Sequence, residues 1–318
     1  MKRVQRQQSR KSFRVWMVII ILLALFEAAL HLFGFAGIDD FMGALLDGSL
    51  TARSAAAAPG PTEGTLEVHV LDVGQGDCIL IRGSDKTILV DASVSDAAPG
   101  ILSYLRKLGV DGIDILINTH PHNDHFGGMR AVMDGMPTAR VLLAPIPEEL
   151  TPTTVSFEKL VTYLGKHQIP TAEARVGDTY DLGGGGVLTI VGPQKTYDDL
   201  NNSSLVCRVD FGRHSFLLTG DMEAKAEKDL LASGVPLRAD VLKVGHHGSN
   251  TSSSRDFLKA VDPDYAVISC GADNDYGHPH DEVLERLRSR GIPIYRTDLD
   301  GAAVFVTDGD QLSVSTAK

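Results

Sequence analysis

The stretch THPHNDHFGG, Thr119–Gly128, carries the strongest signal about the fold of this chain. It follows the apolar run IDILIN, which predicts a buried strand, and precedes a helix expected near Gly127–Asp134. Imidazole nitrogens and carboxylate oxygens suit zinc, manganese or iron, and the glycines allow a tight turn before the helix. The pattern therefore predicts a metal site at a strand end and disfavours an ordinary polar turn. The metal-binding side chains within this stretch are His120, His122, Asp124 and His125.

Composition places the chain among globular proteins. With 318 residues, 43% of them hydrophobic and 22% charged, it can bury a substantial core. Three cysteines exclude a disulfide-rich fold. Each of them, Cys78, Cys207 and Cys270, stands in an apolar run, so we expect small buried side chains rather than reactive thiols.

The charge is distributed unevenly along the chain. The net charge is −11, but residues 1–14 hold six bases and no acid, which leaves 24 bases against 41 acids in the remainder. A body this acidic disfavours general electrostatic attraction to nucleic acid, whose affinity comes largely from basic side chains. Binding at a local site stays open.

A membrane segment is expected near the N-terminus. Residues 15–37 contain only Glu27 and His31 as ionisable side chains, and as a helix would span roughly 35 Å. The uninterrupted apolar part, 15–26, also has the length of a signal peptide, which would give a secreted protein after cleavage. The small-residue stretch 51–64 lies beyond the usual cleavage position, so we favour a retained anchor.

This anchor implies a domain order and a location. The bases of residues 1–14 predict a cytoplasmic stub, followed by the membrane anchor 15–37, a linker 38–64 and one folded domain, 65–318. The protein is then expected to be a single-pass protein of the cytoplasmic membrane, with residues 65–318 outside the cytoplasm. No protein partner is predicted.

The body alternates strand-like runs with helical segments, in two halves of similar design. Helices are expected at Pro99–Leu108, Val155–His167 and Glu223–Ala232, and at the runs SRDFLKAV and DEVLERLRSR. This alternation predicts an α/β protein with two sheets, each covered by helices on its outer face.

The His-x-His-x-Asp-His pattern after a strand resembles the metallo-β-lactamase superfamily. Three further segments match that family in order: Asp91 ending TILVDA, Asp221 in FLLTGD, and the pair His246 and His247 in VLKVGHHGS. The resemblance implies a four-layer αββα sandwich that binds two divalent metal ions, Zn²⁺ or Mn²⁺.

The resemblance narrows further, over about residue 65 to the C-terminus. The segments LDVGQGD, NNSSLV, LKVGHHGS and YGHPHDEVLERL resemble the extracytoplasmic hydrolase domain of ComEC-type DNA-uptake proteins. This implies a hydrolase that uses a metal-bridged hydroxide, as a phosphodiesterase or nuclease on a phosphodiester substrate such as single-stranded DNA. The alternatives are a hydrolase of a small ester, lactone or phosphocholine-type phosphodiester, and a non-catalytic binding module.

The resemblance also assigns two sets of metal ligands. Adjacent side chains diverge, so only one of the paired histidines is expected to bind metal; we assign His247 as the ligand and His246 to the substrate side. The first metal is assigned to His120, His122 and Asp221, and the second to Asp124, His125, Asp221 and His247.

One departure from the wider family lies in the segment NNSSLV, where most members have a further histidine. We expect the amide oxygen of Asn202 as a metal ligand, with a simple turn before the next strand as the alternative. Asp77 and Asp91 are expected to orient the ligands without binding metal.

The remaining assignments concern catalysis and substrate. Asp124, which could orient the attacking hydroxide, is expected to be catalytic together with His246 and His278. Ser249 and Thr251 are candidates for binding a phosphate oxygen, although capping of the next helix is an alternative role for them. His280 is a further candidate for substrate binding, with a structural role at a helix entry as the alternative.

Overall fold

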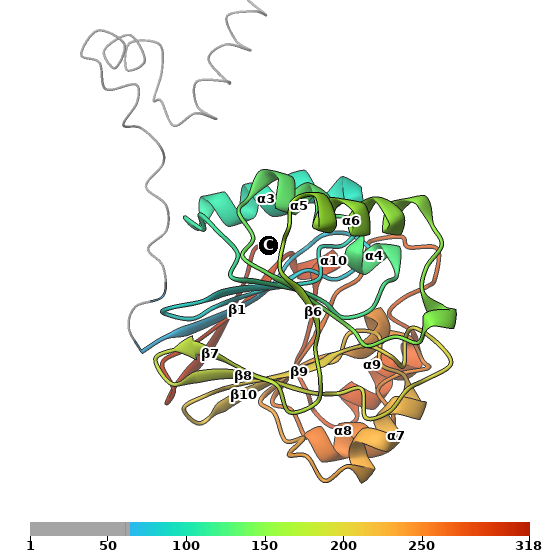
Figure 1. Cartoon of the computed structure of the whole chain (residues 1–318). Coiled ribbons are helices and arrows are strands. Elements are labelled where there is room, and N and C mark those ends of the chain that lie inside the picture. The colour runs from blue at the N-terminus through green and yellow to red at the C-terminus, as the bar shows by residue number, and fades with distance from the viewer. Residues whose placement is uncertain (1–60, 62–63) are drawn as a thin grey trace, which may run out of the picture. The chain divides into compact units, whose positions relative to one another are not determined.

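Two mixed β-sheets packed face to face form the centre of the described protein (Figure 1). The computed structural model describes residue 61 and residues 64–318. Within these residues the first sheet has eight strands, in the order β15-β14-β1-β2-β3-β4-β5-β6, and the second has seven, in the order β13-β12-β11-β10-β9-β8-β7.

The strands of the first sheet are β1 (Leu66–Val70), β2 (Ile79–Arg82), β3 (Thr87–Val90), β4 (Ile115–Asn118), β5 (Val141–Leu143), β6 (Thr171–Glu173), β14 (Ala303–Thr307) and β15 (Leu312–Thr316). Those of the second are β7 (Thr179–Gly183), β8 (Gly186–Gly192), β9 (Val206–Phe211), β10 (His214–Leu218), β11 (Val241–Lys243), β12 (Tyr265–Ile268) and β13 (Ile294–Arg296). Strands β3 to β6 run parallel to one another, as do β10 to β13.

Helices cover the outer face of each sheet (Figure 1). The first sheet carries α3 (Ala98–Lys107), α5 (Met129–Gly135) and α6 (Val155–Lys166), and the second carries α7 (Ala224–Ala232), α8 (Arg255–Val261) and α9 (Asp281–Arg288). The short helices α4 (Asn123–Phe126) and α10 (Thr297–Asp300) lie in connections between elements. The expected sandwich of two sheets with helices outside is therefore confirmed.

The alternation of side chains along each strand divides the hydrophobic core into layers. In β2, Ile79 and Ile81 face the second sheet, whereas Leu80 faces the outer helices. The rings of Phe216 and Phe305 meet edge to face between the sheets, with centroids 6.2 Å apart. Because the central strands are covered on both faces, runs such as ILIN in β4 are buried throughout.

Some elements differ from the expectations. No strand was predicted at the positions of β6, β7 and β15. All residues of β6 and β15 are exposed or half-buried, so these two strands lack the apolar run that marks an inner strand. Within the metal-binding motif, Asn123–Phe126 forms the helical turn α4, where a loop was expected.

The predicted membrane segment 15–37 lies outside the described residues, as do residues 1–14 and nearly all of the linker. In the part of the chain that the structure describes, no helix has both the length and the hydropathy of a membrane span.

Candidate metal centre

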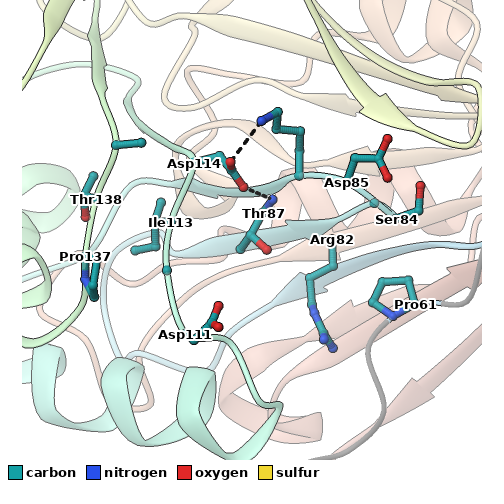
Figure 2. Close-up of a pocket in the computed structure, with 14 residues that line it drawn as sticks. Pro61, Arg82, Ser84, Asp85, Thr87, Asp111, Ile113, Asp114, Pro137 and Thr138 are labelled. Atoms are coloured by element: carbon teal, nitrogen blue, oxygen red, sulfur yellow. Dashed lines mark hydrogen bonds and ion pairs between the residues drawn. The ribbon is translucent and has the colours of Figure 1, made fainter.

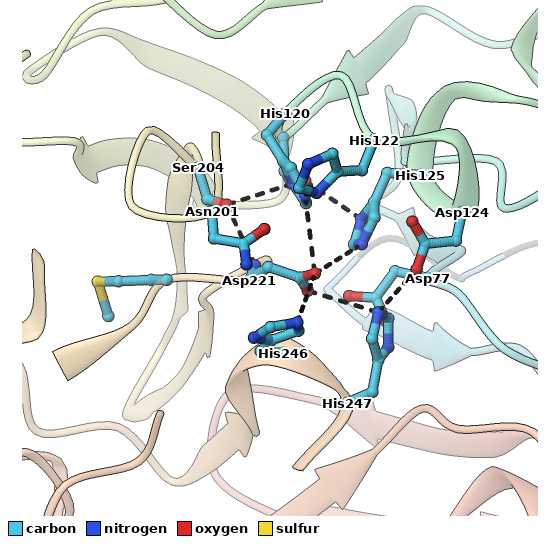
Figure 3. Close-up of polar contacts among 12 residues, drawn as sticks. Asp77, His120, His122, Asp124, His125, Asn201, Ser204, Asp221, His246 and His247 are labelled. Atoms are coloured by element: carbon cyan, nitrogen blue, oxygen red, sulfur yellow. Dashed lines mark hydrogen bonds and ion pairs between the residues drawn. The ribbon is translucent and has the colours of Figure 1, made fainter. Parts of the chain in front are cut away.

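The polar motifs meet at one edge of the sandwich because each follows the carboxyl end of a parallel strand. Asp91 follows β3 and His120 follows β4 in the first sheet, while Asp221 follows β10 and His247 follows β11 in the second. Carboxyl ends of neighbouring parallel strands share an edge, which is the common ligand-binding position of α/β sheets. Figure 3 shows His120, Asp221 and His247 converging from the two sheets.

The loop between β1 and β2 brings a further carboxylate, Asp77, to this edge. Gly76 has a φ of +135°, and a Cβ there would lie 2.4 Å from the backbone oxygen of Asp124. The backbone nitrogen of Asp77 donates to that same oxygen at 3.2 Å. Only glycine permits this close approach of the GQGD loop to the histidine motif.

Asp91 fixes the orientation of the histidine motif through hydrogen bonds. Its carboxylate accepts from the backbone nitrogen of Thr119 at 2.8 Å, from the Thr119 hydroxyl at 2.6 Å and from Asn118 Nδ2 at 3.1 Å. Its Oδ2 also lies 2.7 Å from His125 Nδ1, so Nε2 of His125 points into the cluster. Complete burial raises the pKa of Asp91, although these partners act in the opposite direction.

Asp221 lies at the centre of four imidazoles. Its Oδ2 is 3.3 Å from His125 Nε2, 3.7 Å from His120 Nε2 and 3.9 Å from His246 Nε2, while Oδ1 is 3.6 Å from His247 Nε2. Burial raises the pKa of Asp221, but His125 and His247 outweigh this and hold it well below the usual range. An ionised carboxylate between imidazoles is the arrangement expected of a ligand that bridges two cations.

The outer wall of the cluster is formed by the remaining residues of the motif. His122 Nδ1 is 2.9 Å from His120 Nε2, and Asp124 Oδ2 is 3.3 Å from His247 Nε2. The structure thus brings together all four side chains of the sequence motif that were predicted to bind metal.

These residues fit metal ions. The ligand atoms of two sets, His120–His125–Asp221 and Asp124–His125–His247, each lie within 4.8 Å of one another. Several of their buried atoms make no hydrogen bond within the described residues, among them His125 Nε2, His247 Nε2 and Asp221 Oδ1. Buried polar atoms without partners are costly, and a bound cation would satisfy all three. The mixed nitrogen and oxygen donors suit zinc, manganese or iron.

The two adjacent histidines point in different directions. His247 is 1% exposed, and its Nδ1 lies 3.1 Å from the Ser269 carbonyl oxygen, which leaves Nε2 for the cluster. The His246 side chain is 23% exposed, with Nδ1 3.2 Å from Glu223 Oε1. Both residues have positive φ angles, 50° and 53°, a conformation that costs of order 1–3 kcal/mol and is concentrated at functional sites. This backbone points the His247 imidazole into the buried cluster and leaves the His246 imidazole at the cavity, with its Nε2 3.9 Å from Asp221 Oδ2.

Sequence reasoning missed two charged residues of this centre, Lys243 and Glu223. Lys243 is fully buried, and its Nζ lies 3.0 Å from Asp77 Oδ2 and donates to the Val244 carbonyl at 3.0 Å. Glu223 accepts from Thr251 Oγ1 at 3.0 Å and from Asn201 Nδ2 at 3.2 Å. A lysine within the apolar strand VLK was the available signal for the first; nothing in the sequence marked the second.

The structure brings Asn201, not Asn202, to the cluster. Asn202 donates from Nδ2 to Asp199 at 3.0 Å, and its Oδ1 accepts from the backbone nitrogen of Ala226 at 3.0 Å. Both ends of the Asn202 amide are thus used inside the protein, against the expectation of a metal ligand. Asn201 instead donates from Nδ2 to Glu223 at 3.2 Å, and its buried Oδ1 makes no hydrogen bond within the described residues.

The predicted phosphate-binding residues make hydrogen bonds within the loop that precedes α8, or to that loop. The Ser249 and Thr251 hydroxyls lie 2.9 Å apart, and His280 Nδ1 accepts from the backbone nitrogen of Asn250 at 3.0 Å. None of Ser249, Thr251 and His280 lines the cavity beside the cluster. The helix cap that follows comes from Ser254, whose hydroxyl accepts from Phe257 at the start of α8.

A cavity of about 330 Å³ opens beside the cluster. His278 lines it, and burial together with His246 and His247 lowers the pKa of His278 to about 4. The His278 imidazole is therefore neutral near pH 7. The other lining residues are Gln75, His122, Asn123, Asp124, Asp221, His246, His247 and Tyr276.

A larger cavity, about 530 Å³, lies at the opposite ends of the strands (Figure 2). It borders the starts of β3 and β4, where Asp114 accepts from the backbone nitrogen of Thr87 at 2.8 Å and pairs with Lys86 at 3.1 Å. Its lining contains no histidine or cysteine, so it lacks the nitrogen and sulfur ligands of a typical zinc site.

Comparison with known proteins agrees with the geometry of the centre. The family model described as Metallo-beta-lactamase superfamily matches residues 71–272. The "metallo-beta-lactamase fold protein YhfI" of Bacillus subtilis is similar in structure, with a TM-score of 0.52 at 12% identity, over 76% of this chain and 100% of that one. At this identity the likeness concerns the fold alone.

Curated relatives are similar in sequence. The chain is 34% identical to "Competence protein ComA" of Neisseria gonorrhoeae, over 85% of this chain and 36% of the relative. It is 30% identical to "ComE operon protein 3" of Bacillus subtilis, over 75% and 33% respectively. These matches confirm the ComEC-type resemblance, and the chain spans about a third of the length of the curated relatives that it matches.

Proposed function

Because this chain belongs to the metallo-beta-lactamase superfamily, we propose that it is a metal-dependent phosphodiesterase that acts on nucleic acid. One observation carries the proposal: the buried Asp221 carboxylate, surrounded by four imidazoles, lies against an open cavity. The sequence similarity to competence proteins points to DNA as the polymer.

Two divalent cations would be held by residues of both sheets. When bound, they supply Lewis-acid chemistry: they polarise the phosphoryl group and lower the pKa of water. The proposed ligands are His120, His122 and Asp221 for one ion, and Asp124, His125, Asp221 and His247 for the other.

The remaining residues would position the substrate and its protons. His246 lines the cavity, and Glu223 beside its Nδ1 orients the ring so that Nε2 faces the position proposed for the leaving oxygen. His278, neutral near pH 7, lines the same wall and can accept a hydrogen bond from the substrate. Asp124 lines the same cavity and is proposed to orient the attacking water.

We further propose that residues 15–37 anchor the protein in the cytoplasmic membrane with residues 65–318 outside. The basic residues before this segment support that orientation. Protease digestion of intact spheroplasts should degrade the catalytic domain; complete protection of the domain would contradict the topology.

The enzymatic proposal is tested on the detergent-solubilised full chain. Bound metal is measured by mass spectrometry, and hydrolysis of bis-p-nitrophenyl phosphate is followed with added Zn²⁺ or Mn²⁺. Asp221→Asn should lower turnover by about a hundredfold or more. The matched control Asp310→Asn changes a side chain that is 80% exposed and should retain wild-type turnover.

Two results would reject the proposal. Absence of both bound metal and turnover in the wild type would favour a non-catalytic module. Turnover on a lactone or carboxylic ester with none on any phosphodiester would favour the other hydrolase class.

A further inference from the structure

An exposed aromatic ring stands at the rim of the catalytic cavity. Tyr276 is 65% exposed, and among the described residues the other strongly exposed large hydrophobic side chains are all aliphatic. Aromatic rings are usually buried, because they lose a large apolar area from water. Tyr276 also lines the cavity beside Asp221. An exposed ring in this position indicates a contact with a ligand.

The loop that carries this ring is held in place by Asn274. Its Oδ1 accepts from the backbone nitrogens of Tyr276 at 3.2 Å and His278 at 3.0 Å. Its Nδ2 donates to the Gly271 carbonyl at 2.9 Å and to the His278 carbonyl at 2.6 Å. The backbone of Tyr276 is therefore positioned before any ligand arrives, which lowers the entropy cost of binding.

The rings of three residues form a column from solvent to the cluster. Tyr276 stacks on His278, with centroids 5.5 Å apart and planes at 22°. His278 in turn lies 6.2 Å from His247, with planes at 29°. A flat ring stacked on Tyr276 would lie at the rim of the cavity that Tyr276 and Asp221 both line.

Apart from the proposed metal ions, the lining of the cavity offers no basic side chain to the backbone phosphates. The cavity lining contains four histidines and two aspartates but no lysine or arginine, and the whole chain carries a net charge of −11. A nucleic acid strand therefore has little to gain from ion pairs here. Stacking of a base on an aromatic ring is the alternative source of affinity, worth about 1–3 kcal/mol per base.

We propose that Tyr276 is a stacking platform for the nucleobase next to the scissile phosphodiester, and that it makes the enzyme selective for single-stranded nucleic acid. A base inside a duplex cannot reach the platform without being extruded from its stack. The inference rests on the proposed phosphodiesterase function and adds the class of polymer and the recognition contact.

The test compares two oligonucleotides of equal length with the full chain in detergent and added Mn²⁺. One is an oligothymidylate; the other replaces its nucleosides with abasic tetrahydrofuran residues. The measured quantity is the ratio of kcat/KM for the base-bearing strand to that for the abasic strand. We expect the wild type to prefer the base-bearing strand by about tenfold, mainly through KM, with little dependence on salt.

Variants of Tyr276 test whether its aromatic ring causes this preference. Tyr276→Ala should abolish the preference, and Tyr276→Phe should retain it, because stacking needs the ring and not the hydroxyl. The matched control Tyr163→Ala removes a half-exposed tyrosine from the outer helix α6 and should leave the ratio unchanged.

The outcomes separate the two proposals. If the wild type cleaves both strands equally and Tyr276→Ala cleaves them at the same ratio, the platform is rejected while the phosphodiesterase stands. If Tyr276→Ala loses activity equally on both strands, the ring has a general structural role and the platform is again rejected. If the wild type cleaves neither strand nor bis-p-nitrophenyl phosphate, both proposals fail.

Discussion

Lys243 and Asp77 form an ion pair in the interior, with Nζ and Oδ2 3.0 Å apart and both side chains at most 1% exposed. Lys243 ends strand β11 of the second sheet, and Asp77 lies in the loop before β2 of the first. The same carboxylate has its Oδ1 3.4 Å from Nδ1 of His247. The pair therefore links the two sheets directly behind a proposed metal ligand.

Lys243→Met should destabilise the folded protein by about 3–5 kcal/mol, because it leaves the buried Asp77 carboxylate unpaired. Adding Asp77→Asn should recover part of the loss, since no buried charge then remains. Urea denaturation measures both. The control Lys86→Met breaks an exposed pair with Asp114 and should cost less than about 1 kcal/mol. Equal losses for the two lysine variants would contradict the special role of the buried pair.

The acid stability of the metal-free protein should depend on Asp77. Burial raises the pKa of this carboxyl, but Lys243 and His247 outweigh burial and hold the pKa well below its usual range. In the unfolded chain Asp77 titrates near pH 4. Its ionised form therefore stabilises the fold above about pH 4, and this stabilisation is lost as the pH falls toward the folded pKa.

Denaturation in EDTA at pH 5 and pH 3 measures this effect. The wild type should lose more stability between the two pH values than Asp77→Asn/Lys243→Met, which lacks both the carboxyl and its buried partner. The same loss in both proteins would show that other groups control acid unfolding.

Asp91→Asn should weaken metal binding about 10- to 100-fold. The substitution removes the charge that holds His125 Nδ1 at 2.7 Å while keeping the volume of the side chain. Competition with a chromophoric chelator gives the affinity, and circular dichroism checks the fold. An unchanged metal affinity in a folded variant would show that Asp91 does not orient the ligand.

The two adjacent histidines should have separable effects. His247→Ala should lower the number of bound metal ions, because the buried imidazole faces Asp124 and Asp221. His246→Ala should keep the metal and lower kcat by about 10²- to 10⁴-fold. Metal analysis and turnover are measured on the same preparations. Loss of metal from His246→Ala with retention in His247→Ala would reverse the assignment.

Asn202→Ala should act on stability and not on metal binding. Its amide joins Asp199 to the backbone nitrogen of Ala226 near the start of α7, and the loss of that cap should cost about 1 kcal/mol. Asn201→Ala is the matched comparison, because Asn201 donates to Glu223, which pairs with His246 beside the cluster. If Asn202→Ala alone reduced metal affinity, the original assignment of Asn202 as a ligand would be restored.

Local patterns in the sequence were enough to predict much of the fold. The run ILIN before His120 and the run FLLTG before Asp221 mark strand ends, and the spacing of Val283, Leu284 and Leu287 marks a helix face. Such signals depend on neighbours within a few residues. The edge strand β6 was missed for the same reason, since its exposed residues TAE carry no apolar pattern.

The sequence by itself thus determined the layered architecture, the family and the set of histidines and carboxylates at the strand ends. Only the tertiary structure decided which atoms of that set face one another. It joined Lys243 to Asp77, buried His247 in the cluster with His246 at the cavity, and linked Asn201 to Glu223, while Asn202 accepts from a backbone nitrogen of α7. These choices depend on contacts between segments far apart in the chain, and on single backbone angles such as the positive φ of the paired histidines, which no short-range pattern encodes.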